Sequence, residues 1–292
     1  MTAERTPKST TTAVGEALAS LLTLSRPRFW FYLAGPVVVG VAYAAADVPD
    51  LFAPVALALF AYFLVPANVY LYGVNDVFDR DVDEANPKKD GREARFSGET
   101  WVAVVVAACG LLLVPVAAFA PPLAWPYLAA YAVLATEYSA PPLRFKTTPF
   151  LDSLSNGLYV LPGAAAYAAV AGQHPPLAAL VGAWLWTMAM HTFSAIPDIE
   201  PDREAGISTL ATVLGETRTY AYCFATWTAA AVAFAAVDFR LGALLAVYPV
   251  FVAWVARSSV AVDRAYWWFP YLNTVIGTML TLGALWRLTN GV

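Results

Sequence analysis

Residues 51–83 read LFAPVALALFAYFLVPANVYLYGVNDVFDRDVD, and this stretch decides the fold. Its first part, up to Val74, contains no charged side chain and is long enough to cross the roughly 30 Å hydrocarbon core of a bilayer as a helix. Its last part carries Asp76, Asp79 and Asp83 within a few residues of one another. The stretch therefore predicts a transmembrane helix with an acidic cluster at one end.

The composition of the whole chain agrees with a membrane protein. Of its 292 residues, 60% are hydrophobic and 13% are charged, and the mean hydropathy is +0.59. A soluble protein of this length does not bury so much apolar surface in its core. The net charge of −4 excludes a generally basic surface, so no nucleic-acid partner is expected. Cys109 and Cys223 fall in apolar spans without the spacing of a disulfide framework or a metal site.

Hydropathy, interrupted at charged residues, proline and glycine, predicts an all-α fold, an integral membrane bundle of nine transmembrane helices. Long uninterrupted apolar runs favour helices over the alternating strands of a membrane barrel. Residues 1–25 are expected to form a polar cytoplasmic tail, and residues 26–292 a single transmembrane domain. The spans are expected near residues 29–46, 52–74, 101–120, 123–140, 151–171, 177–197, 218–237, 241–260 and 267–288.

The basic residues predict the orientation of these spans. If the N-terminus is cytoplasmic, that side of the membrane holds every lysine and arginine of the chain except Arg240 and Arg287. Because basic residues accumulate in cytoplasmic loops, this asymmetry favours an N-terminus inside and a C-terminus outside. We therefore expect a multi-pass protein of the cell membrane whose acidic clusters face the cytoplasm.

Two acidic groups occur at equivalent helix ends. Asn75, Asp79 and Asp83 are spaced by four residues and share one helix face, and Asp198 and Asp202 repeat the spacing at the end of the sixth expected span. Like charges at this spacing destabilise an isolated helix. One such group is readily explained as a solvated loop, but two at the same depth predict a cation between them. Carboxylates and substrate phosphates are ligands that suit Mg²⁺.

The motifs also carry a resemblance to a known family. NDVFDRDVD (75–83) resembles the first Asp-rich signature of the UbiA-type intramembrane prenyltransferases, and DIEPDREAGISTLATVLG (198–215) resembles their second. With the expected spans, the resemblance covers nearly the whole chain after residue 25. It implies a helical bundle with a central cavity capped by cytoplasmic loops. It also implies Mg²⁺-dependent transfer of a prenyl group from an allylic diphosphate to an acceptor.

The resemblance implies roles for individual residues. The metal-binding and catalytic aspartates would be Asp79, Asp83, Asp198 and Asp202, with Asn75 and Asp76 as further metal ligands. The residues that would bind the diphosphate are Arg92, Arg95, Lys146 and Tyr138. Arg144 is a weaker candidate for this role, because the preference for basic residues in cytoplasmic loops already explains it. Phe96 stands where many relatives have proline, which puts the shape of the acceptor entrance in doubt.

Two polar residues inside the spans are further candidates. His191 precedes Asp198, and Asn68 precedes Asn75, by two helical turns on the same face. Either residue would suit an acceptor or water site, as a base or a water-positioning group. An interhelical hydrogen bond is the alternative for both.

The acceptor is indicated by two longer segments. YGVNDVFDRDVDEANPKKDGREARF (72–96) and EYSAPPLRFKTTPFLDSLSNGLYVLPG (137–163) look most like the lycopene elongase branch of the family. That branch implies dimethylallyl diphosphate as donor and lycopene, or another lipophilic molecule among the membrane lipids, as acceptor. A quinone precursor or geranylgeranylglyceryl phosphate is the alternative acceptor. A transporter is disfavoured, because transporter acids usually lie near mid-membrane rather than at helix ends.

Overall fold

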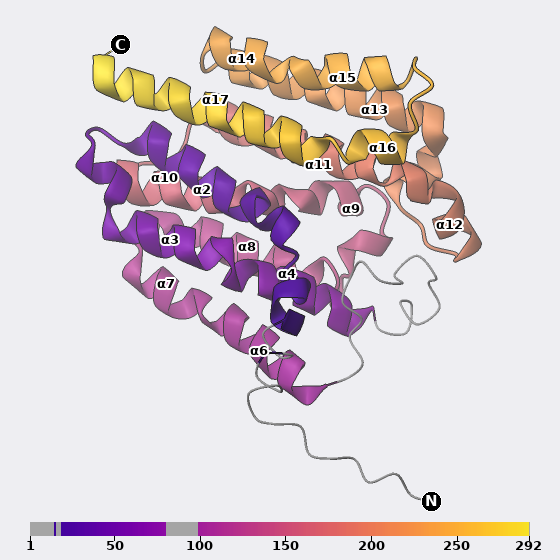
Figure 1. Ribbon diagram of the computed structural model, residues 1–292, viewed down its shortest axis with the longest axis horizontal. Helices are drawn as coiled ribbons and strands as arrows, with labels where there is room; N and C mark the ends of the chain where they lie inside the picture. Colours follow the sequence, from indigo (N-terminus) through magenta and orange to yellow (C-terminus); the bar gives the residue numbers. More distant parts are fainter. Residues whose placement is uncertain (1–14, 16–18, 80–98, 292) are drawn as a thin grey trace, which may run out of the picture.

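The computed structural model describes residues 15, 19–79 and 99–291, and these residues form α-helices and short 3₁₀ turns with no strand among them. Asp83, Arg92 and Arg95 lie outside the described residues. Most of the helices run roughly side by side in one bundle (Figure 1). The helices are α2 (Trp30–Ala44), α3 (Pro54–Leu64), α4 (Pro66–Phe78), α6 (Thr100–Leu111), α7 (Leu113–Phe119), α8 (Trp125–Glu137), α9 (Leu151–Leu154), α10 (Leu161–Ala171), α11 (Leu177–Ser194), α12 (Ile199–Glu204), α13 (Leu210–Ala235), α14 (Phe239–Leu245), α15 (Val247–Val255), α16 (Val262–Tyr266) and α17 (Phe269–Asn290).

Within the part of the chain that the structure describes, three helical segments are long and apolar enough to cross a membrane, namely Pro54–Phe78, Thr100–Phe119 and Leu177–Glu204, and Phe239–Val255 is a shorter apolar segment. The all-helical class is confirmed, but the count of nine spans is not. The expected spans near 29–46, 123–140 and 151–171 contain α2, α8 and α10, which have only 15, 13 and 11 residues. Hydropathy does not detect the ends of these helices, so the expected spans include residues of the 3₁₀ turns η1 (Pro27–Phe29), η4 (Pro122–Ala124) and η6 (Ser155–Tyr159) and residues beyond the ends of α2 and α8.

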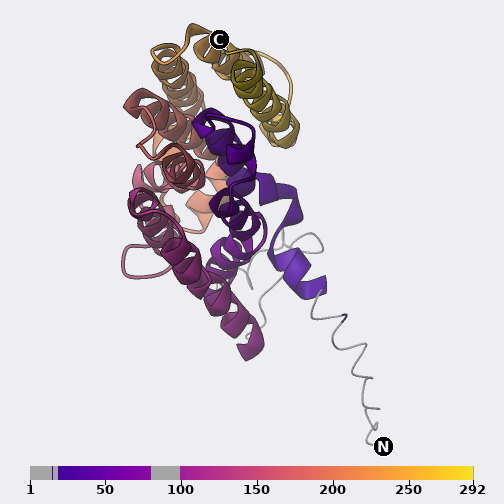
Figure 2. The same cartoon turned by 90° about the vertical axis from the view of Figure 1, so that its left-hand side faces the viewer.

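The bundle is held together by close approach of helices and by two large apolar clusters. One cluster joins α2, α3, α4, α8 and α10, and the other joins α11, α13, α15 and α17. A Cβ on Gly40 of α2 would lie 2.2 Å from the carbonyl oxygen of Gly163 of α10, so the two backbones are in direct contact there. Helix α17 packs beside α2, as the view turned by 90° also shows (Figure 2). The first and last long segments of the chain are therefore neighbours.

The packing extends into the expected N-terminal tail. Residues 19–24 are helical, and the Leu24 side chain is 5% exposed in a cluster with Val69 and Val106. Arg26, which follows, has a left-handed φ of 49° and turns the chain into η1. The end of α4 and the short helix α12, which carry the two acidic motifs, lie towards the same end of the bundle, away from the C-terminus (Figure 1).

Candidate active site

The first acidic motif occupies the last turn of α4 and meets the segment that follows α8. Asp79 caps α4, and its carboxylate is 13% exposed. Arg144 donates from Nη2 to its Oδ1 at 3.0 Å, and Lys146 pairs with its Oδ2. Lys146 was predicted as a diphosphate ligand, whereas Arg144 was the weaker candidate. The structure places both on the same carboxylate.

One further contact fixes this segment against α4, and a second bond joins the two ends of the segment itself. Asn75 donates from Nδ2 to Ser139 Oγ at 3.2 Å, and the backbone N–H of Lys146 donates to the carbonyl of Tyr138 at 3.0 Å. The turn η5 (Phe145–Thr147) carries Lys146, and it begins after Arg144, whose φ of 42° is left-handed. Predicted residues from two separate motifs are thereby brought together at one end of the bundle.

Asp76 points in a different direction from Asp79. Its side chain is 2% exposed and accepts a hydrogen bond from Arg26 Nη2 at 3.2 Å. The Arg26 guanidinium carbon also lies 4.7 Å from the centre of the Tyr72 ring. From the sequence, Arg26 is expected only to lie on the cytoplasmic side, because no local pattern links it to a motif 50 positions away.

A cavity of about 130 Å³ begins beside Arg26 and lies among η1, α2, α4, η6, α11 and α16. Its wall is predominantly aromatic, and ring contacts such as Phe29–Tyr32 at 5.2 Å and Tyr32–Tyr159 at 6.2 Å hold the rings in place. Aromatic faces attract cations, so the wall suits a positively charged intermediate. The lining residues are Arg26, Phe29, Tyr32, Tyr72, Asn156, Tyr159, Met190, His191, Ser194 and Tyr266.

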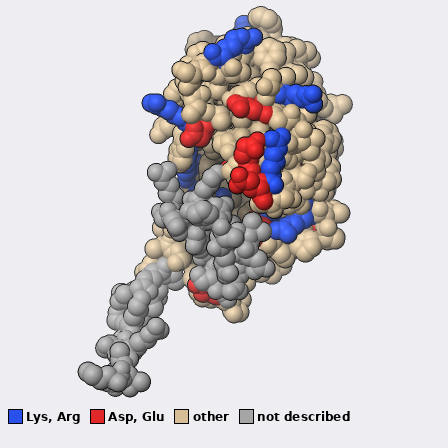
Figure 3. All heavy atoms as spheres, turned by 90° about the vertical axis from the view of Figure 1, so that its right-hand side faces the viewer, with Lys and Arg blue, Asp and Glu red and all other residues tan. Residues whose placement is uncertain are grey.

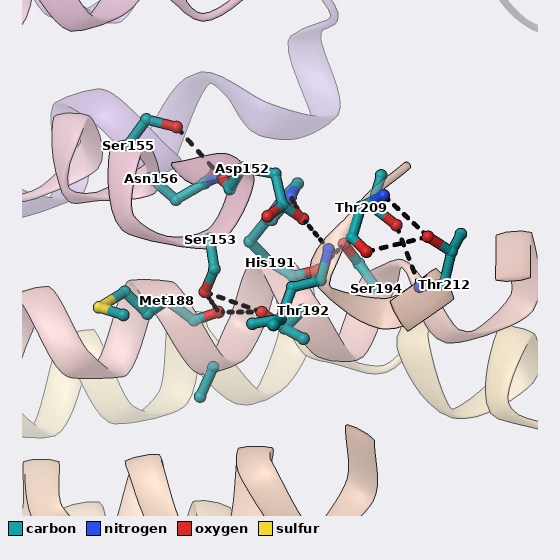
Figure 4. A network of polar contacts seen from close by, with 12 residues as sticks. Asp152, Ser153, Ser155, Asn156, Met188, His191, Thr192, Ser194, Thr209 and Thr212 are labelled. Carbon is teal, nitrogen blue, oxygen red and sulfur yellow. Dashed lines mark hydrogen bonds and ion pairs between the residues drawn. The ribbon is translucent and has the colours of Figure 1, made fainter. Parts of the chain in front are cut away.

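His191 is on the cavity wall, whereas Asp198 is exposed and is not among the lining residues. Its ring meets the Tyr138 ring edge-on, with centres 6.1 Å apart. Its Nε2 lies 3.9 Å from Oδ2 of Asp152, a carboxylate on α9 that is 1% exposed (Figure 4). Sequence reasoning passed over Asp152. The signal available was a lone acidic residue in the apolar run that begins the fifth expected span.

Asn68 occupies a different environment from His191. It is 0% exposed, and its Nδ2 donates to the carbonyls of Phe63 and Leu64, each at 3.0 Å. These carbonyls precede the break between α3 and α4 at Val65. Asn68 is not among the residues that line the aromatic cavity. Its bonds stabilise the helix break, and its predicted place beside the acceptor is untested.

The second acidic motif follows α11 in η7 (Ile196–Asp198) and α12. Asp198 is exposed and Asp202 is half-buried. Arg203 donates from Nη1 to Glu200 at 2.7 Å and from Nη2 to the carbonyl of Thr212 at 2.7 Å, which ties α12 to the start of α13. Acidic and basic side chains gather on this end of the molecule (Figure 3).

The donors at this end suit Mg²⁺ in chemical type. The described part of the first motif supplies two carboxylates and one amide oxygen within a single turn of α4, and arginine and lysine stand beside Asp79. Within the described residues no group of three His, Cys, Asp or Glu side chains gathers closely enough to hold a metal ion. The predicted metal ligand Asp83 and the predicted phosphate ligands Arg92 and Arg95 are outside that range.

Comparison with known proteins is consistent with this geometry. Residues 33–286 match the UbiA prenyltransferase family. A lycopene elongase/hydratase of Haloferax volcanii is 71% identical over 278 residues, covering 95% of this chain and 92% of the relative. A lycopene elongase/hydratase of Halobacterium salinarum is 66% identical over 271 residues, covering 93% and 98%.

Solved structures give the same fold at low sequence identity. A UbiA homolog from Archaeoglobus fulgidus bound to DMAPP and Mg²⁺ superposes with a TM-score of 0.73 at 20% identity, covering 92% of this chain and 99% of that one. The structure of a digeranylgeranylglyceryl phosphate synthase superposes with a TM-score of 0.64 at 14% identity, covering 92% and 99%. Because the family match spans most of the chain and two relatives are 71% and 66% identical over nearly their full lengths, this protein belongs to the UbiA prenyltransferase family and is a prenyltransferase.

Proposed function

We propose that the protein transfers a dimethylallyl group from dimethylallyl diphosphate to lycopene, with addition of water, on the way to C50 carotenoids. The observation that carries this proposal is the 71% identity to a lycopene elongase/hydratase over nearly the full length of both chains. The aromatic cavity supports it, because among the described residues Arg26 is the only permanently charged one in its wall, and it contacts Asp76. A hydrocarbon acceptor offers no group for further charged side chains to recognise.

In this proposal the two acidic motifs hold Mg²⁺, which stabilises the negative charge that develops on the departing diphosphate. The residues that would hold the ion are Asn75, Asp79, Asp83, Asp198 and Asp202. Asp76, the sixth predicted ligand, contacts Arg26 and would have to exchange this partner for the ion. Arg144 and Lys146 bind the diphosphate oxygens together with Arg92, Arg95 and Tyr138. In the structure both cations contact the Asp79 carboxylate. Their positive charges would attract an anionic group such as the diphosphate to this position.

The chain's own residues would then determine where the dimethylallyl cation goes. The rings of Phe29, Tyr32, Tyr72 and Tyr159 line a space in which their faces would stabilise a cation. The terminal double bond of lycopene attacks the allylic carbon, a C–C bond forms, and the positive charge moves to a tertiary carbon of the acceptor. Water then adds to that carbon or a proton leaves it.

The same proposal places the chain in the cell membrane. Residues 26–292 form one transmembrane domain of nine passes, with residues 1–25 and the acidic motifs in the cytoplasm and the C-terminus outside. The distribution of basic residues supports this orientation. The shorter helices would complete their passes with the 3₁₀ turns and polar ends that flank them.

The test is expression in a lycopene-producing cell followed by pigment analysis. We expect C45 and then C50 products, and none from cells carrying the empty vector. In membranes the reaction should require dimethylallyl diphosphate and Mg²⁺. If lycopene-rich membranes give no C45 product while a quinone precursor or geranylgeranylglyceryl phosphate is prenylated, the lycopene assignment is wrong.

A further inference from the structure

A buried carboxylate faces the cavity wall and has no part in metal or diphosphate binding as proposed above. Asp152 is 1% exposed, and its Oδ2 accepts the backbone N–H of Leu210 at 3.0 Å. Its Oδ1 has no hydrogen-bond partner among the described residues. Buried carboxylate oxygens are nearly always satisfied in folded proteins, so an orphaned one points to a group that is absent from the protein alone.

The neighbour of Asp152 on the cavity side is His191. The 3.9 Å between Nε2 and Oδ2 suits a pair that tightens when the imidazole gains a proton. Neither ring nitrogen of His191 makes a hydrogen bond within the described residues, and the side chain is 20% exposed towards the cavity that it lines. The ring is therefore available to a molecule in the cavity on one side and faces a carboxylate on the other.

A polar network fixes the position of this pair. The residues that follow each partner are joined, because Thr192 Oγ1 donates to Ser153 Oγ at 2.8 Å and Ser153 Oγ donates to the Met188 carbonyl at 3.1 Å (Figure 4). Asn156, another cavity residue, donates from Nδ2 to the Asp152 carbonyl at 2.6 Å. Helices α9 and α11 are thus locked in register at the level of the pair.

We propose that His191, positioned by Asp152, is the base that takes a proton from the water that adds to the prenylated acceptor. This rests on the proposed function. The water oxygen forms a C–O bond to the tertiary carbon, one of its O–H bonds breaks, and the proton goes to Nδ1 of His191. The imidazolium, with Nε2–H directed at Asp152, is balanced by that carboxylate. The proton then passes to the released diphosphate, which restores the neutral ring.

The charges in the cavity support this assignment. The aromatic rings that line the cavity do not accept the proton that the attacking water loses, so a separate base is needed. An imidazolium formed in an apolar site is costly unless an anion lies beside it. Asp152 supplies that anion without reaching the cavity itself. The arrangement follows the usual pattern of a base oriented by a carboxylate through its second nitrogen.

The experiment measures how the product divides between tertiary alcohol and alkene. Membranes with His191→Gln, Asp152→Asn, the control His174→Gln and the wild-type protein receive lycopene, dimethylallyl diphosphate, Mg²⁺ and heavy-oxygen water. His174 is the other histidine of the chain, and it is exposed and bonded to Tyr127. Mass spectrometry reports the labelled alcohol and the alkene, and diphosphate release is measured in the same samples.

We expect the alcohol-to-alkene ratio to fall about 10-fold or more in His191→Gln, since a general base typically contributes at least that much. Asp152→Asn should lower the ratio less, because its amide oxygen still accepts the Leu210 N–H. His174→Gln should match the wild type. Because the ratio is taken within each sample, lower expression or turnover does not change it.

Two results would overturn the inference alone. One is a wild-type protein that forms the alcohol together with a His191→Gln variant that has the same alcohol-to-alkene ratio. The other is a raised ratio, which would mean that His191 removes a proton from carbon. Wild-type membranes that form no prenylated lycopene would refute the proposed function itself, and this inference with it.

Discussion

Substituting Gly157 by alanine tests how the cavity wall is supported. Gly157 lies in η6 between Asn156 and the residues leading to Tyr159, and a Cβ there would be 1.9 Å from Cε2 and 2.2 Å from Cζ2 of Trp184 on α11. Carbon atoms normally approach to about 3.5–4.0 Å, so the indole would have to move by roughly 1.5–2 Å. The glycine does not have a left-handed φ, so the substitution acts through this contact and not through backbone strain.

The expected loss in the free energy of unfolding follows from the contacts of the Trp184 indole. Its Nε1 donates to the Leu154 carbonyl at 2.9 Å, a bond worth about 0.5–1.5 kcal/mol. Overpacking of a dense core adds about 1–3 kcal/mol. We expect a loss of roughly 2–4 kcal/mol, which at about 2–4 °C per kcal/mol lowers the apparent Tm in detergent by on the order of 10 °C. Diphosphate release should also fall, since Asn156 and Tyr159 line the cavity.

Two variants make the result interpretable. Gly277→Ala, on α17 with nothing within 4 Å of an added Cβ, should leave the Tm unchanged or raise it slightly. Trp184→Leu combined with Gly157→Ala should recover part of the loss, giving a favourable coupling in the double-mutant cycle. A Tm of Gly157→Ala within about 1 °C of the wild type would show that the indole moves without cost, and the reasoning would be wrong.

Three further outcomes are expected. Asp79→Ala and Asp202→Ala should each abolish Mg²⁺-dependent diphosphate release, because each removes a proposed metal ligand at a helix end. Both variants should elute from size-exclusion chromatography like the wild type. Near-normal release in either variant would remove that residue from the metal site. Lys146→Met should raise the KM for dimethylallyl diphosphate about 10-fold, equivalent to about 1.4 kcal/mol, with a smaller effect on kcat; an unchanged KM would mean that Lys146 only balances Asp79. A reporter fused after Val292 should behave as external in whole cells, and a cytoplasmic signal there would overturn the proposed orientation.

Local sequence was sufficient for the class of the protein and for the acidic motifs. Apolar runs without charges require a membrane or a very large core, and spacing by four places residues such as Asn75 and Asp79 on one helix face whatever the helix packs against. The lengths of the helices could not be predicted as well from the sequence. The hydropathy of residues 52–74 reads as one continuous helix, yet the chain breaks at Val65 before Pro66, and Asn68 stabilises the break.

The partners of the motif residues were decided only by tertiary structure. Arg26 reaches Asp76 across 50 positions, Arg144 reaches Asp79 across 65, and Asp152 and His191 meet although they lie on different helices. Periodicity states which face of a helix a residue occupies, but it carries no information on which other helix covers that face. That depends on how closely backbones approach, as at Gly40 and Gly163, and on which side chains fill the space between them. The sequence therefore determined an acidic membrane site, and the packing of the helices determined which cations, aromatic rings and buried carboxylate surround it.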